Sequence, residues 1–169
     1  FVGNATVSGN TADASGGVGA FASGGGVSII NGRLNLSTNT VIDMNSATAG
    51  STDLAEALGG GVQVGTGTQL QISGISVTNN AADADANTDG FAQAWGGGMN
   101  VTPLVAIPAL IERSTFGDNT ASADFNVSGT ANARGGGIYT DQSPGGVVLL
   151  ARSTVSGNAA TSNDAALGG

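Results

Sequence analysis

The amino-acid sequence predicts a parallel β-helix, a coil in which equivalent short strands stack on one another. Three observations lead to this fold class: the chain repeats itself every 35 to 39 residues, a block of three glycines recurs in each repeat, and the apolar stretches between these blocks are short. A fixed repeat of this length is typical of stacked architectures. Residues 1–169 are therefore expected to form one β-helical segment of about four and a half coils, cut from a longer repeat protein.

Small residues dominate the composition and exclude two other classes of protein. The 169 residues include 30 Gly but only 5 Phe, 1 Trp, 1 Tyr and 2 Met, which is too little bulk for the core of a conventional globule. With 40% hydrophobic and 9% charged residues, the chain is also too apolar and too weakly charged for a disordered protein. A stacked repeat resolves this conflict, because each side chain can pack on its own copies.

The first repeated block has the pattern apolar-x-x-Asn, and its asparagines are spaced 35, 35, 39 and 39 residues apart. Stacked strands lie about 4.8 Å apart, so equivalent asparagine side chains can pass amide hydrogen bonds from coil to coil. The predicted ladder consists of Asn10, Asn45, Asn80, Asn119 and Asn158. The apolar residue of each block is expected to point inward, giving a core column of Val7, Ile42, Val77, Phe116 and Val155.

The second repeated block is Gly-Gly-Gly-apolar, and we expect it to form a corner where glycine permits positive φ angles and close approach of the backbone. Its copies are Gly24–Val27, Gly59–Val62, Gly96–Met99 and Gly135–Ile138.

The apolar stretches suit strands of 3 to 6 residues and are too short for an amphipathic helix. Each repeat offers three such strands: one after the glycine block, one in the middle and one that ends at the asparagine. Only Asn31-Gly32 resembles a hairpin turn, so parallel stacking into three sheets is expected. The segments from each asparagine to the next glycine block are polar and are expected to be loops that carry function.

The segments Phe116-Gly-Asp-Asn119 and Phe1-Val-Gly-Asn4, together with the GGGV, GGGM and GGGI blocks, resemble the FxxN and GGA(I/L/V) repeats of chlamydial polymorphic outer-membrane proteins and related autotransporter passengers. The resemblance covers almost the whole chain. It implies a right-handed β-helix that is secreted or displayed on a bacterial surface, often adhesive and without an active site. Two departures are that a third Gly replaces the Ala of that family and that most Phe positions are aliphatic.

Several functions lack the residues that they need. The net charge is −8, and the only cations are Arg33, Arg113, Arg134 and Arg152, which argues against binding to nucleic acid. With no Cys and no His, there is no thiolate or imidazole metal site and no His-based catalytic triad. No apolar run approaches 18 residues, so membrane insertion of this segment is not expected.

A calcium site is one candidate, and it is the only cofactor that the sequence suggests. Asp85, Asn87 and Asp89, followed by Gly90 and preceded by Asp83, match the first half of a calcium-binding loop, whose oxygen ligands alternate along the chain. The alternative is a solvated acidic loop, because the position of the usual bidentate Glu is occupied by Gly96.

An apolar turn is a second candidate. Leu104, Val105 and Ile107 stand where the next repeat has polar turn residues, and they predict either an interface with another chain or a turn folded back over its own sheet. Trp95 offers either a platform for sugar stacking or a packed side chain.

Together these features predict a non-catalytic extracellular shaft or passenger that acts in adhesion or surface structure. Its partners would be the flanking parts of the parent chain, further copies of itself, or a host protein or glycan. Two alternatives remain: a self-associating filament protein and a polysaccharide-active enzyme. Arg113 and Arg152 share one repeat position, but paired carboxylates do not recur on a common face, which disfavours the enzyme.

Overall fold

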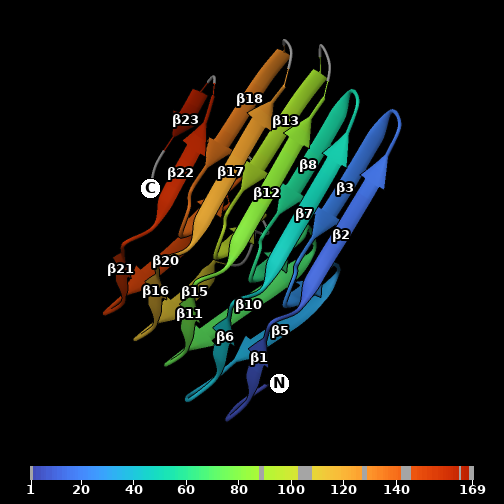
Figure 1. Cartoon of the computed structure of the whole chain (residues 1–169). Coiled ribbons are helices and arrows are strands. Elements are labelled where there is room, and N and C mark those ends of the chain that lie inside the picture. The colour runs from blue at the N-terminus through green and yellow to red at the C-terminus, as the bar shows by residue number, and fades with distance from the viewer. Residues whose placement is uncertain are drawn as a thin grey trace.

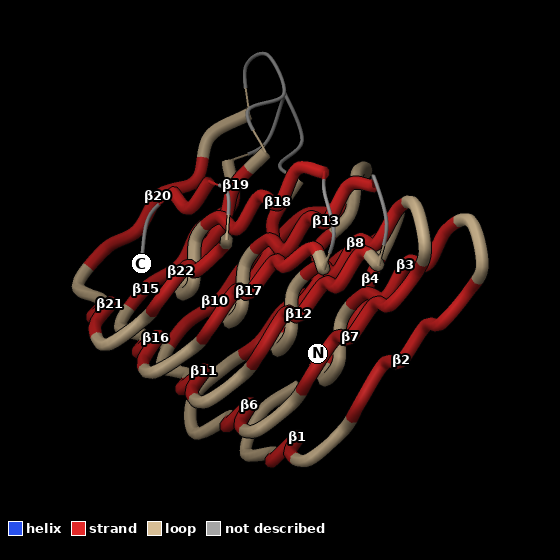
Figure 2. The backbone as a smooth tube through the Cα atoms, turned by 45° about the horizontal axis from the view of Figure 1, so that its top comes forward, coloured by secondary structure: helices blue, strands red, loops and turns tan. Residues whose placement is uncertain are grey.

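In a computed structural model the chain winds into a β-solenoid, in which each strand pairs in parallel with its counterpart one repeat away (Figure 1). The structure describes residues 2–87, 90–102, 108–126, 129–141, 146–163 and 165–167, and these residues form strands and turns without any helix. There are four complete coils of five strands each, followed by three strands of the next coil. Figure 2 shows the coils stacked side by side along one axis.

The strands form five parallel sheets, named here A to E. Along each coil the chain passes through sheets B, C, D, E and A in that order. Sheet B contains β1(Thr6–Ser8), β6(Val41–Asp43), β11(Ser76–Thr78), β16(Thr115–Gly117) and β21(Thr154–Ser156). Sheet C contains β2(Thr11–Gly16), β7(Ser46–Ser51), β12(Ala81–Ala86), β17(Thr120–Phe125) and β22(Ala159–Ser162). Sheet D contains β3(Gly19–Ser23), β8(Leu54–Leu58), β13(Gly90–Trp95), β18(Gly129–Arg134) and β23(Ala165–Leu167). Sheet E contains β4(Val27–Ile29), β9(Val62–Val64), β14(Met99–Val101) and β19(Ile138–Thr140). Sheet A contains β5(Gly32–Leu36), β10(Thr68–Ser73), β15(Ala109–Glu112) and β20(Val148–Ala151).

The parallel solenoid is as predicted, but the expected number of three sheets is wrong. The two additional sheets, C and D, are built from the segments that were expected to be functional loops. In these segments alanine alternates with polar residues, as in Ala82-Asp83-Ala84-Asp85-Ala86 on β12. This alternation has the period of a strand with one buried face. The low strand propensity of alanine conceals this signal in the sequence.

Sheets C and D enclose a core made almost entirely of alanine. Fifteen buried alanines form one cluster, including Ala47, Ala84 and Ala92, which are all 0% exposed. On sheet C these residues pair in register, so that Ala84 lies beside Ala49 on one side and Ala123 on the other. Because a methyl group is short, alanine allows the two sheets to pack closely along the length of the solenoid.

A second core lies among sheets A, B and E and contains the larger side chains. Its members include Leu36, Ile72, Met99 and Ile111, all at or below 1% exposure. The predicted core column on sheet B is in register from coil to coil, and its three central members are fully buried while the two outer members are partly exposed. From first to last strand it runs Val7, Ile42, Val77, Phe116 and Val155. Val155, on the outermost strand of the sheet, is 43% exposed.

The predicted asparagine ladder joins sheets B and C, at the boundary between the two cores. Asn45 Nδ2 donates to Asn80 Oδ1 at 3.0 Å and to the carbonyl oxygen of Val7 at 2.9 Å. The backbone N–H of Asn45 also donates to Asn80 Oδ1, at 3.0 Å. The same side-chain link joins the whole series Asn10, Asn45, Asn80, Asn119 and Asn158.

The glycine blocks face this ladder from the opposite wall and form a narrow waist between the two cores. A Cβ atom on Gly61 would lie 2.9 Å from Asn80 Cγ, and one on Gly60 would overlap the carbonyl oxygen of Ala81. The first glycine of the block has a different role, since Gly59 has a φ of 57° and turns the chain from sheet D into sheet E. Close approach across the solenoid, as well as positive φ, therefore explains the three-glycine block.

The residue before each ladder asparagine adopts a left-handed backbone conformation. The column contains Gly9, Met44, Asn79, Asp118 and Gly157, with φ between 53° and 68°. Glycine adopts this conformation without strain, and Asn and Asp tolerate it better than other residues. Met44 is the exception, and its side chain is 61% exposed.

Candidate functional site

The predicted calcium ligands lie at the outer face and tip of sheet C. Asp83 and Asp85 are on β12 and point away from the alanine core, and Asn87 follows the strand. Asp89 lies outside the described residues. The expected loop is therefore a strand over Asp83 and Asp85, which displays both carboxylates on the outer face of sheet C.

Asn126, one coil further on, contacts two of these predicted ligands. Its Nδ2 donates to Asp85 Oδ1 at 3.0 Å and to Asn87 Oδ1 at 2.7 Å. Among the described residues no group of three or more His, Cys, Asp or Glu side chains is placed to hold a metal ion.

The predicted apolar interface at Leu104, Val105 and Ile107 lies outside the described residues. Trp95 is described and packs its ring against Tyr139 of the next coil, with ring centroids 5.2 Å apart and planes tilted by 36°. Trp95 is half-buried, and its Nε1 atom is buried without a hydrogen-bond partner. The side chain is therefore packed at the junction of sheets D and E.

The outer face of sheet C is polar and partly acidic. Asp83 pairs in register with Thr48 and Ser122, and Asp85 pairs with Gly50 and Asp124. The expectation that paired carboxylates do not recur on a common face is therefore wrong for Asp85 and Asp124. Partial burial raises the pKa of Asp83, and the neighbouring carboxylates of Asp124 and Asp85 raise it further. Its side chains are mostly small and lie in columns set by the register of the strands.

The outer face of sheet D is more apolar. Phe21 and Phe91 are 63% and 42% exposed, and Leu54 pairs in register beside Phe91. Glu56 lies in register between Phe21 and Gln93, and its partial burial raises the pKa of its carboxyl group. This face combines exposed aromatic rings with a carboxyl and amide column.

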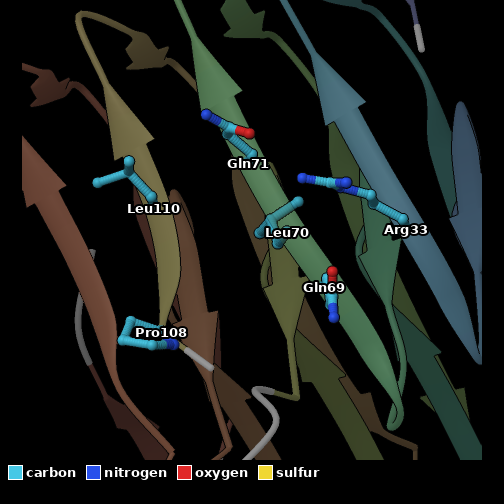
Figure 3. Close-up of a pocket in the computed structure, with 6 residues that line it drawn as sticks. All are labelled: Arg33, Gln69, Leu70, Gln71, Pro108 and Leu110. Atoms are coloured by element: carbon cyan, nitrogen blue, oxygen red, sulfur yellow. The ribbon is translucent and has the colours of Figure 1, made fainter. Parts of the chain in front are cut away.

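A hollow of about 200 Å³ opens on the outer face of sheet A (Figure 3). Arg33 on β5 lies in register with Gln69 on β10, and Gln71 on β10 lies in register with Leu110 on β15. Figure 3 shows the Arg33 side chain reaching from β5 toward β10. The lining is completed by two apolar residues, Leu70 and Pro108.

The polar side chains of this hollow are not used to hold the fold together. Arg33 and Gln71 are exposed and Gln69 is half-buried. In the described part of the chain, the side chains of Arg33, Gln69 and Gln71 make no hydrogen bond or ion pair. Their hydrogen-bonding groups are available to a ligand.

Sequence reasoning missed this site because it followed the columns that repeat. Arg33, Gln69 and Gln71 belong to columns that change from coil to coil, so self-comparison gives them no weight. The available signal was the strand pattern: Arg33 precedes Leu34, and Gln69 and Gln71 flank Leu70, which places all three on the outer face of neighbouring strands.

No family model, no curated protein and no solved structure matches this chain. None of the described residues forms a helix with the length and apolar character needed to cross a membrane.

Proposed function

We propose that this chain is a non-catalytic β-solenoid shaft that works outside the cell, on a bacterial surface, and presents its outer faces for adhesion. The observation that carries the proposal is that the repeated residues make contacts inside the solenoid, while variable side chains lie on its outer faces. The repeated asparagines and glycines make their contacts within the solenoid, as in the hydrogen bond from Asn80 to Asn119. Side chains that differ in chemistry from coil to coil, such as Phe21, Glu56 and Gln93 in one register column of sheet D, face outward.

The outer face of sheet D is the adhesive surface in this proposal. Phe21 and Phe91 are large, exposed hydrophobic side chains, so burying them against a partner costs little desolvation energy. Buried aromatic side chains contribute strongly to the energy of binding. Phe21 and Phe91 stand on parallel strands fixed by the register of sheet D, so their spacing is set by the backbone. A rigid array of this kind binds a partner without first having to be ordered.

The extracellular bacterial setting is supported by the sequence. The FxxN-like and glycine-block motifs resemble those of surface-displayed passengers.

A bead-binding experiment tests the adhesive function. Fluorescent beads coated with the chain are applied to host cell layers and to immobilised matrix glycoproteins, and their retention is compared with beads carrying Phe21→Ser/Phe91→Ser. We expect retention by the wild type and loss in the double variant. The matched control, Thr48→Ala on the outer face of sheet C, should leave retention unchanged. Adhesion through sheet D would be contradicted if the wild type and both variants were retained equally, or if none of the three proteins were retained.

A second assay tests the non-catalytic part of the proposal. The chain is incubated with neutral and acidic polysaccharides, and new reducing ends and unsaturated products are measured. We expect neither to accumulate. Turnover that copurifies with the folded chain would show that it is an enzyme.

A further inference from the structure

We propose that the hollow on the outer face of sheet A binds a single carboxylate carried on a sugar ring, that is, one hexuronic acid residue. The hollow is lined by Arg33, Gln69, Leu70, Gln71, Pro108 and Leu110. This assignment goes beyond adhesion and does not depend on it.

Arg33 is the group that selects a carboxylate. It is one of only four cations in a chain of net charge −8, and its exposed guanidinium has no partner among the described residues. A guanidinium presents N–H groups in a planar fork that matches the two oxygens of a carboxylate. The overall negative charge repels polyanions, which favours a ligand with an isolated carboxylate.

Gln69 and Gln71 supply the contacts that a sugar needs beside its carboxylate. They are two residues apart on β10, so both side chains stand on the outer face of the sheet, and Gln69 is in register with Arg33. Each amide can donate and accept, which suits hydroxyl groups that also do both. Pro108 and Leu110 add an apolar wall that can cover the C–H face of a ring.

Size and topology favour one sugar ring over an extended peptide. The volume of about 200 Å³ is below the roughly 300 to 1,000 Å³ of drug-sized ligand pockets, and it fits a single ring. A peptide that binds in extended form usually pairs with a free strand edge. Here β10 is already paired on both sides, with β5 and with β15, so the hollow offers side chains but no free backbone.

The test is a titration of the ¹⁵N-labelled chain followed by NMR of the Arg33 side-chain N–H and the Gln69 and Gln71 amides. The probes are D-glucuronate and D-galacturonate, with D-glucose as the matched neutral sugar and N-acetyl-alanine as a peptide-like carboxylate. We expect saturable shifts with at least one uronate, with a dissociation constant in the millimolar range. Glucose should bind at least about tenfold more weakly than that uronate.

Four variants locate the binding. Arg33→Ala should weaken uronate binding at least about tenfold, and Arg33→Lys should weaken it less because it keeps the charge but loses the fork. The control Arg152→Ala removes a cation outside the hollow and should bind like the wild type. Gln71→Leu keeps Arg33 and should also lose uronate binding. Circular dichroism establishes that each variant is folded.

Three results would overturn the assignment: no saturable shift with either uronate, uronate binding that survives Arg33→Ala, or tighter binding of N-acetyl-alanine than of the uronates. None of these results bears on bead retention through sheet D, so this proposal and the adhesive function fail separately.

Discussion

Asn80 and Asn119 lie one coil apart, and Asn80 Nδ2 donates to Asn119 Oδ1 over 2.9 Å while both side chains are buried. The same Nδ2 also donates to the carbonyl oxygens of Ile42 at 3.0 Å and Thr78 at 2.8 Å. One amide thus satisfies backbone groups of two coils and a side chain of a third. The ladder is a continuous network, in which removal of one member leaves several buried partners unpaired.

Removing one ladder member should therefore be costly. Asn80→Ala leaves the carbonyl of Ile42 and the amides of Asn45 without their partner, and we expect a loss of about 3 kcal/mol in the free energy of unfolding. Urea denaturation followed by circular dichroism measures it. Asn132→Ala, on the outer face of sheet D, is the control and should change stability by less than about 0.5 kcal/mol. Equal effects of the two substitutions would show that the ladder adds nothing to stability.

The glycine waist predicts a sharp contrast between two Gly→Ala substitutions. In Gly60→Ala the new methyl group overlaps the carbonyl oxygen of Ala81 and lies 2.6 Å from that of Gly97, so we expect a loss of roughly 3 kcal/mol or more. In Gly50→Ala the methyl group meets no atom within 4 Å, and stability should rise by about 0.5 kcal/mol. Thermal melts of the two variants decide the matter, and a stable Gly60→Ala protein would rule out the tight waist.

The alanine core predicts that larger residues fit on one face of β12 only. Ala84→Val adds two methyl groups between sheets C and D, where Ala84 is 0% exposed, and should cost about 2 kcal/mol. Ala81→Val, whose side chain is on the outer face, should be near neutral. Guanidinium denaturation compares the two variants, and the prediction fails if the buried substitution is tolerated as well as the exposed one.

The left-handed backbone conformation of Met44 predicts that replacing this residue with glycine stabilises the chain. The φ of 53° at Met44 is strained for a methionine, while glycine occupies the same place at Gly9 and Gly157. Met44→Gly should raise the free energy of unfolding by about 1 kcal/mol, because relief of the left-handed strain outweighs the entropy of the glycine. Differential scanning calorimetry measures the change. Met44→Ala keeps the strain and should show no gain, so a similar gain in both variants would point to the exposed side chain as the cause.

The pKa of Glu56 predicts a dependence of stability on pH. Burial raises this pKa in the folded state, so the folded chain holds its proton at a pH where the unfolded chain has released it. The contribution of Glu56 to the free energy of unfolding should therefore fall as the pH rises from the pKa of the unfolded state through the raised pKa of the folded state. It should remain lower at higher pH. Melting temperatures across this window should fall less steeply in Glu56→Gln. A steeper fall in that variant would contradict the sign.

The repeated columns made the solenoid predictable from sequence. Asparagine spacing of 35 and 39 residues and the apolar residue three places earlier correctly indicate stacking, since Val77 pairs with Ile42 and Phe116 as expected. The number of sheets is not predictable by the same reasoning, because alanine and glycine are at least as common in loops as in strands. Ala82 and Ala84 carry no strong strand preference, and only the opposing alanine face makes them strand residues.

The candidate site was harder to predict than the fold. The hollow depends on which outward side chains become neighbours after coiling, and Arg33 and Gln69 are separated by a whole repeat in sequence. For the predicted calcium ligands, the sequence indicates a loop. Their spacing fits a loop motif, but the alternation with alanine makes the segment of Asp83 and Asp85 an extended strand.

The waist also has a consequence for engineering by insertion. The asparagine spacing grows from 35 to 39 residues without any break in the ladder, and the added residues fall between β12 and β13 and between β14 and β15 instead of at the waist. Coil perimeter and coil register are therefore controlled by different parts of the chain. Foreign peptides grafted into those two connections should lengthen a coil while its neighbours keep their alignment.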